Sequence, residues 1–199
     1  MCPNWNALVG DDYQYVFPLT ANTKFGIKYL YQPYFAQQLG LFSKHKISTE
    51  DVKTYDKILL SPGPGLPKDA GIMPELLKTY GASKSILGVC LGLQAIGEAY
   101  GGTLKNLDTV FHGIATPINI ISEDVIFNNC PKSFTVGRYH SWVINNNQLP
   151  ADLQITATDV QGNIMALKHK THDVSGVQFH PESILSEYGE AMIQNWLKA

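Results

Sequence analysis

The segment Gly88–Gln94, with the sequence GVCLGLQ, places a cysteine between two glycines at a junction of two predicted elements. Residues 85–89 are apolar and β-branched, which is typical of a buried strand. Residues 91–100 carry apolar side chains at helical spacing, and two glycines end that pattern. Glycine on both sides of Cys90 lets the backbone turn sharply without a Cβ clash. The chain is therefore constrained to a strand–turn–helix unit with Cys90 at its apex.

A cysteine on such a turn has the placement of a nucleophile elbow, in which the reactive side chain projects from a sharp turn. The N-terminus of a helix is the positive end of the helix dipole, which favours the thiolate of Cys90. The alternative is a small apolar cysteine that closes a core strand. The pattern alone does not separate these two interpretations, so a catalytic interpretation needs a base.

A candidate base follows another predicted strand, residues 174–179, in the sequence VQFHPES. His180 comes at the C-terminal end of that strand, and open α/β sheets build their sites at this edge. Glu182 is placed to bind one imidazole nitrogen, so that the other nitrogen accepts the thiol proton. Cys90, His180 and Glu182 would then be nucleophile, base and orienting group. Taken alone, His-Pro-Glu is also an ordinary surface turn.

A loop with alternating proline and glycine, SPGPGLP at residues 61–67, follows a third predicted strand. Such a loop is stiff and exposes its main chain. The N–H donors available in it belong to Gly63 and Gly65, because Pro64 has none. One of these donors and the N–H of Leu91 are candidates for an oxyanion hole. Loops of this composition otherwise only mark turns.

Taken together and in order, SPGPG, GVCLGxQ, RYHS and VQFHPES resemble the motifs of the class I, triad-type glutamine amidotransferases. The similarity is greatest to the glutaminase subunit, component II, of anthranilate synthase and of aminodeoxychorismate synthase. The resemblance implies a triad of Cys90, His180 and Glu182, with oxyanion N–H groups from Gly63 and Leu91. It also implies a glutamine site lined by Gly63, Pro64, Gly65, Gln94, Ser141 and Trp142. Leucine is typical of the family at position 142, so Trp142 departs from the pattern, and a main-chain contact there would tolerate the change.

The resemblance implies that the chain hydrolyses L-glutamine to glutamate through a cysteine thioester. The ammonia would pass to a chorismate-using synthase subunit, component I, in a hetero-oligomer. The product would be anthranilate, for tryptophan biosynthesis, or 4-amino-4-deoxychorismate, for folate biosynthesis. Two alternatives remain: a stand-alone Cys-His-Glu hydrolase of the same fold acting on γ-glutamyl or peptide bonds, and a non-catalytic regulatory subunit.

The resemblance extends from about Ile47 to Ala199 and is poor before that. The family opens with an apolar strand and a D-N-Y/F-D-S-F motif, to which only residues 7–13 are similar. Residues 14–30 have no counterpart in the family, and residues 35–40 are a candidate end of the first helix. We expect a single amidotransferase domain over residues 1–199 in which residues 1–46 are atypical.

The composition predicts which general class of protein the chain belongs to. A hydrophobic content of 44% and a charged content of 16% predict a folded chain, and the net charge of −2 argues against a nucleic-acid or membrane surface. The three cysteines form no C-x-x-C pair, which suits a reducing, cytoplasmic compartment, and we find no leader or apolar run long enough to span a bilayer.

The other polar motifs in the sequence do not predict a cofactor. Neither a phosphate-binding loop nor a dinucleotide fingerprint is present, so no nucleotide cofactor is expected. His169 and His172 are spaced like metal ligands, but the lysines beside them indicate a solvated loop, and no metal is expected. His140 is expected to bond main chain near the site.

Strands are predicted near residues 56–60, 85–89, 115–121, 133–140, 153–158, 164–169 and 174–179, and helices near 71–80, 91–100 and 186–198. This order predicts an α/β fold with three layers and an open, mainly parallel sheet that has an antiparallel edge. The resemblance implies the amidotransferase variant of the flavodoxin-like or Rossmann-like folds.

Overall fold

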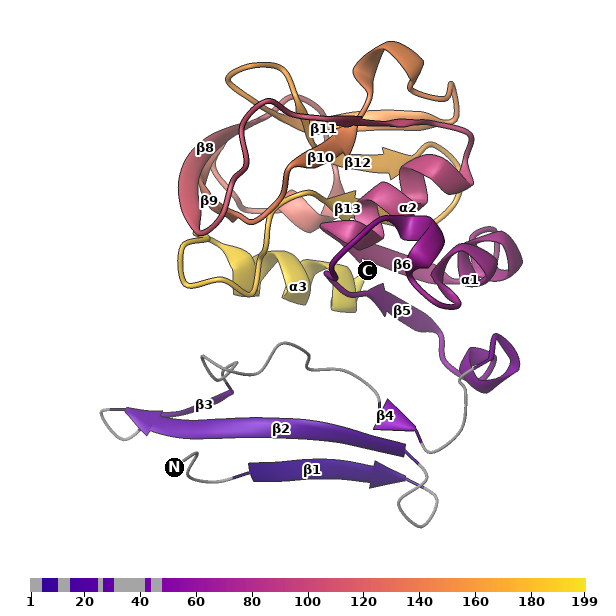
Figure 1. Ribbon diagram of the computed structural model, residues 1–199. Coiled ribbons are helices and arrows are strands. Elements are labelled where there is room, and N and C mark those ends of the chain that lie inside the picture. Colours follow the sequence, from indigo (N-terminus) through magenta and orange to yellow (C-terminus); the bar gives the residue numbers. More distant parts are fainter. Residues whose placement is uncertain (1–4, 11–14, 25–26, 31–41, 44–47) are drawn as a thin grey trace. The chain divides into compact units, whose positions relative to one another are not determined.

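The computed structural model describes residues 5–10, 15–24, 27–30, 42–43 and 48–199 (Figure 1). The chain divides into two compact units, Met1–Ser48 and Thr49–Ala199. In the first unit β2 pairs antiparallel with each of the other three strands. The strands are β1 (Trp5–Gly10), β2 (Tyr15–Lys24), β3 (Ile27–Leu30) and β4 (Phe42–Ser43).

The N-terminal unit contains the residues that are atypical of the family. Residues 7–10, part of the stretch 7–13 that is similar to the opening of the family, lie within β1. Residues 14–30, for which the family offers no counterpart, contribute β2 and β3. The candidate helix end at residues 35–40 lies outside the described residues. A single domain over residues 1–199 stays a prediction.

The second unit is built on a seven-stranded sheet with the order β5-β6-β13-β12-β11-β8-β9. Only the neighbours β5, β6 and β13 run parallel. The strands are β5 (Lys57–Leu60), β6 (Ser85–Val89), β8 (Ile114–Ile120), β9 (Ser133–Arg138), β11 (Leu153–Asp159), β12 (Ile164–His169) and β13 (Val174–Val177).

The α/β class and the antiparallel edge are confirmed, but the antiparallel part is wider than an edge. The pairs β13–β12, β12–β11, β11–β8 and β8–β9 are all antiparallel. For the two pairs that involve β12, the physical reason is the length of the connections. Strand β12 is joined to β11 and to β13 by turns of four residues, whereas a parallel crossover takes a dozen residues or more.

Helices cover both faces of the sheet, which confirms the three layers (Figure 1). They are α1 (Met73–Tyr80), α2 (Leu91–Ala99) and α3 (Gly189–Lys198). One buried cluster joins Leu76 of α1 and Leu93 of α2 to Ile86 of β6. The other joins Trp196 of α3 to Leu87 of the same strand. Neighbouring residues of one strand thus anchor opposite layers, because strand side chains alternate between faces.

The predicted elements of this unit are confirmed to within three residues at each end; the largest difference is at the start of α3, and β9 and β13 each end two residues earlier than predicted. A second, two-stranded antiparallel sheet was not predicted; it joins β7 (Leu104–Asn106) to β10 (Trp142–Ile144). Short 3₁₀ turns occupy η1 (Glu50–Val52), η2 (Pro67–Asp69), η3 (Val125–Phe127) and η4 (Asn146–Gln148). No helix among the described residues is long and apolar enough to cross a membrane.

The three parallel strands position the site. β5 ends at Leu60, β6 at Val89 and β13 at Val177, and parallel strands end at the same edge of a sheet. The loop of residues 61–67, Cys90 and the segment of residues 178–182 therefore meet at this edge, as expected for an open α/β sheet.

Candidate active site

Cys90 occupies the turn between β6 and α2 in a strained backbone conformation, with φ 52° and ψ −99°. A non-glycine residue with positive φ costs on the order of 1–3 kcal/mol and needs support from its surroundings. The N–H of Cys90 provides support by donating to the carbonyl oxygen of Val177 at 2.8 Å. Only 6% of the residue is exposed. The geometry is that of a nucleophile elbow.

The two glycines beside Cys90 are required by close packing. A Cβ on Gly92 would lie 2.4 Å from the carbonyl oxygen of Leu60, at the end of β5. A Cβ on Gly88 would lie 2.5 Å from the carbonyl carbon of Gly92. Only glycine permits these approaches, so the sequence pattern brings the end of β5 directly against the elbow.

His180 and Glu182 form the contact expected from their spacing, with 2.8 Å between His180 Nδ1 and Glu182 Oε1. Burial favours the neutral imidazole, but the nearby Cys90 and the hydrogen bond and charge of Glu182 outweigh it and raise the pKa of His180 to about 9. Within residues 48–199, Nε2 of His180 is buried without a hydrogen-bond partner of normal geometry. Cys90 is thus close enough to influence the imidazole without a well-formed hydrogen bond to Nε2.

The two residues expected to form the oxyanion hole lie side by side. A Cβ on Gly63 would come within 2.9 Å of Leu91 Cδ2. Leu91 is the first residue of α2, and the first N–H groups of a helix have no carbonyl partner inside it. In the loop of residues 61–67, Pro64 and Gly65 are exposed.

The remaining residues expected around glutamine come from α2, from β10 and from the position directly before β10. Gln94 Nε2 donates to the carbonyl oxygen of Trp142 at 2.9 Å. The neighbouring residue, Ser141, accepts from the N–H of Leu107 at 2.7 Å through its carbonyl oxygen. Trp142 therefore contacts Gln94 through its main chain, and contact with glutamine itself stays a prediction.

His140 also bonds the main chain at this point, as expected, with 3.2 Å between Nδ1 and the carbonyl oxygen of Trp142. On its other side, Nε2 accepts from Arg138 Nε at 3.1 Å. Burial, followed by the charge of Arg138, lowers the pKa of His140 to about 3. His140 is therefore neutral at physiological pH, and both ring nitrogens are already used.

Arg138 and Asp159 form a buried ion pair that the sequence analysis missed, with 2.9 Å between Nη1 and Oδ2. Burial acts to raise the pKa of Asp159, but hydrogen bonds from Asn163, the charge of Arg138 and a bond from Gln161 hold it below its usual value. The guanidinium also lies 3.6 Å from the centre of the Phe111 ring. Arg138 belongs to the RYHS motif, but nothing in the sequence pairs it with Asp159.

Gln178 was also missed. Its Nε2 lies 3.6 Å from Cys90 Sγ, and the residue has no exposed surface. The available signal was its position two residues before His180, which places its side chain on the same face of an extended segment.

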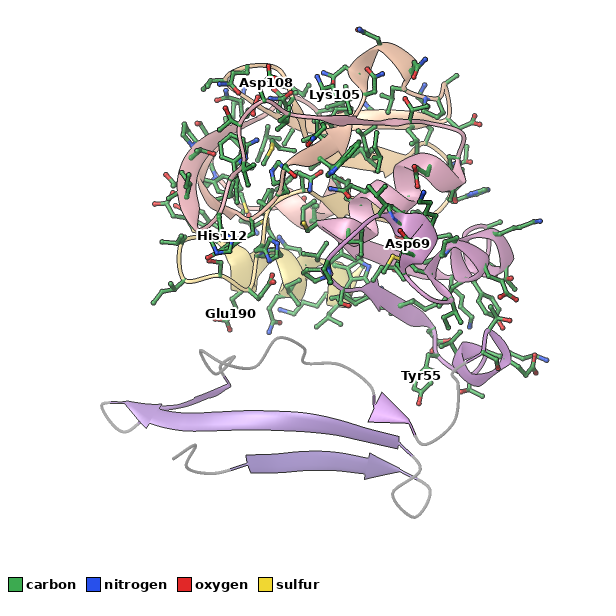
Figure 2. The ribbon with its side chains drawn as sticks, viewed as in Figure 1. Tyr55, Asp69, Lys105, Asp108, His112 and Glu190 are labelled. Carbon is green, nitrogen blue, oxygen red and sulfur yellow. The ribbon has the colours of Figure 1, made fainter. Side chains whose placement is uncertain are left out.

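Aromatic side chains border His180. The ring of Tyr139 lies 4.8 Å from the imidazole, and its hydroxyl is 3.0 Å from Ser183 Oγ. His112, labelled in Figure 2, meets Tyr139 edge-on with 6.0 Å between ring centres. The exposed ring of Tyr139 thus covers one side of His180.

His169 and His172, considered above as metal ligands, have structural contacts. Their rings stack with 4.0 Å between centres, and Nδ1 of His169 accepts the N–H groups of Thr171 and His172. Across the part of the chain that the structure describes, no group of three or more His, Cys, Asp or Glu residues is arranged to hold a metal ion.

Comparison with known proteins agrees with this geometry. The profile of the family described as glutamine amidotransferase class-I matches residues 34–199. The chain is 44% identical over 141 residues to aminodeoxychorismate synthase component 2 of Escherichia coli, covering 71% of this chain and 75% of that protein. It is 43% identical over 143 residues to anthranilate synthase component 2 of Lactococcus lactis, covering 71% and 72% respectively.

Among solved structures, a candidate GMP synthase subunit from Thermoplasma acidophilum aligns with a TM-score of 0.69. The sequence identity is 25%, over 77% of this chain and 76% of that chain.

Proposed function

The chain belongs to the class-I glutamine amidotransferase family, and we propose that it is a glutaminase subunit that supplies ammonia to a chorismate-using synthase. The observation that carries the proposal is the elbow itself. Cys90 has a strained backbone beside the His180–Glu182 pair, and α2 begins directly after it. The names of the relatives, components of anthranilate and aminodeoxychorismate synthases, support the class of partner.

The residues allow a two-step reaction. The Cys90 thiolate attacks the side-chain amide carbon of glutamine, and the N–H groups of Gly63 and Leu91 stabilise the oxyanion. The tetrahedral intermediate collapses, the C–N bond breaks, and His180 gives its proton to the departing ammonia. Neutral His180 then takes a proton from water, which attacks the glutamyl thioester. Glutamate leaves, and the thiolate and imidazolium are restored.

The charge state of His180 suits the first step. Because the pKa of His180 is about 9, the imidazole is protonated at neutral pH. The proton that ammonia needs is therefore already in place when glutamine binds. Glu182 holds Nδ1, so Nε2 is the nitrogen left to face the reacting atoms.

The glutamine itself is expected to lie between the loop and α2, contacting Gly63, Pro64, Gly65, Gln94, Ser141 and Trp142. Ammonia released into water would be lost, so we propose a hetero-oligomer in which the synthase subunit receives it directly. The partner then decides between anthranilate and 4-amino-4-deoxychorismate as product.

The test is reconstitution with each candidate synthase subunit. Cys90→Ser should abolish product formation from glutamine and leave product formation from ammonium salts intact. Cys130→Ser is the matched control, because Cys130 is a half-buried free cysteine packed against the core rather than at the elbow. Loss of both activities in an assembled Cys90→Ser complex would overturn the ammonia-donor proposal, as would unchanged glutamine-dependent activity.

A further inference from the structure

The buried amide of Gln178 connects the nucleophile with the glutamine side of the site. Its Nε2 is 3.6 Å from Cys90 Sγ, and its Oε1 is 3.4 Å from Gln94 Nε2. Gln94 Nε2 also donates to the carbonyl oxygen of Trp142. A continuous path of hydrogen bonds therefore runs from a main-chain carbonyl to the thiol.

The carbonyl of Trp142 sets the direction of every bond in this path. A carbonyl oxygen only accepts, so the group of Gln94 that faces it must be the NH₂. The second hydrogen of that NH₂ requires an acceptor, which makes the facing atom of Gln178 its Oε1. The NH₂ of Gln178 is then the group that faces Cys90 Sγ. A donor at this position stabilises negative charge on the sulfur.

The Trp142 carbonyl is itself held by a buried group of charged and polar side chains. Arg138 Nε can only donate, so Nε2 of His140 carries the lone pair and Nδ1 carries the proton that bonds Trp142. Asp159 in turn fixes the guanidinium of Arg138. Each donor and acceptor between Asp159 and Cys90 is thus determined by its neighbour.

We propose that Gln178 is a further catalytic residue, which donates an N–H to the Cys90 thiolate. Arg138, His140 and Gln94 are positioning residues that hold the Gln178 amide in the donating orientation. Because Gln94 also belongs to the proposed glutamine site, the path links substrate binding to the nucleophile. Only this last link depends on the proposed function.

The first experiment measures the rate at which iodoacetamide labels Cys90 at neutral pH in the absence of glutamine, followed by mass spectrometry. Gln178→Glu keeps the size of the side chain but replaces the donor with a carboxylate, and Gln178→Leu removes all polarity. Both variants should label about tenfold more slowly than the unaltered chain, or slower still, as expected for loss of a hydrogen bond to a charged group.

Gln154→Glu is the matched control, because Gln154 is a half-buried glutamine that donates to Ser122 Oγ at 2.6 Å. Its labelling rate should be unchanged. Thermal unfolding identifies the variants that fold. If Gln178→Leu does not fold, Gln178→Glu alone tests the proposal. Labelling at the unaltered rate in a folded Gln178 variant would overturn the proposal. Failure of the unaltered chain to hydrolyse glutamine would instead count against the proposed function.

The second experiment tests the positioning of the amide. Gln94→Leu should slow labelling of Cys90 even without glutamine, because Gln178 loses the donor that orients it. In the double variant with Gln178→Leu the two effects should not multiply, since both act through one bond. Multiplicative effects, or unaltered labelling in Gln94→Leu, would show that Gln94 does not act through Gln178.

Discussion

His180 and His140 lie in two regions of one site, and their pKa values move in opposite directions, to about 9 and about 3. His180 follows β13 and faces the carboxylate of Glu182 and the thiol of Cys90. His140 follows β9 and is buried beside the guanidinium of Arg138. At neutral pH one imidazole is therefore charged and the other is neutral.

The surroundings, not the residue type, therefore decide which of the two histidines is suited to proton transfer. An anionic neighbour stabilises the imidazolium of His180 and leaves Nε2 without a partner of normal geometry among residues 48–199. A cationic neighbour and burial hold His140 in one neutral tautomer, with both nitrogens occupied. The first arrangement suits proton transfer, and the second suits the orientation of main chain.

The greatest loss of activity is expected at His180, the charged histidine. His180→Ala should lower kcat for glutamine hydrolysis by about 10³- to 10⁴-fold, because it removes the proton donor and base. His140→Gln, which keeps a donor and an acceptor, should cost about tenfold or less. Steady-state kinetics on both variants measure these losses in kcat. Equal losses would contradict the assignment of different roles to His180 and His140.

The second effect concerns the stability of the buried region around His140, the neutral histidine. Arg138→Met should lower the free energy of unfolding by about 3–5 kcal/mol, because it leaves Asp159 as a buried, unpaired charge. Urea unfolding measures it. Adding Asp159→Asn to Arg138→Met should restore part of the loss, because asparagine carries no charge and still accepts from the N–H groups of Gln161 and Asn163. A second substitution that adds its own full cost would show that the pair is not the cause.

A smaller effect is expected from Glu182→Gln, which leaves a base but removes the anion that raises the pKa of His180. Activity of the unaltered chain should fall as pH rises through about 9, where the imidazolium is lost. In the variant this fall should begin at a lower pH, and kcat at pH 7 should drop by about ten- to a hundredfold. A pH–rate profile with the alkaline limb still near 9 would show that Glu182 does not set the charge of His180.

The smallest effect concerns acid stability. Because the pKa of Asp159 is held below its usual value of 3.8, its contribution to folding is present above that pH and is lost as pH falls below it. Asp159→Asn should therefore make unfolding less dependent on pH between about 4 and 2. Urea unfolding across this range measures the slope, and an unchanged slope would contradict the contribution of Asp159.

Sequence reasoning was most successful where contacts are local. The elbow around Cys90 and the contact between His180 and Glu182 each depend on residues within a few positions of one another. Missed features depend on distant residues: Arg138 pairs with Asp159, and Gln178 reaches Cys90, 88 positions away. Both side chains belong to motifs found in the sequence, RYHS and VQFHPES, but no local pattern indicates which distant residue each one contacts.

The strand–turn–helix units, the order of the motifs and the family follow from the residues alone, because they depend on local backbone preferences and residue spacing. The charge states of the two histidines depend on the tertiary structure. The elevated pKa of His180 and the depressed pKa of His140 arise from burial and from charges that the fold brings within a few ångströms. The donor and acceptor roles along the path from Trp142 to Cys90 also depend on the tertiary structure, because each group's role is fixed only when its partner is in place.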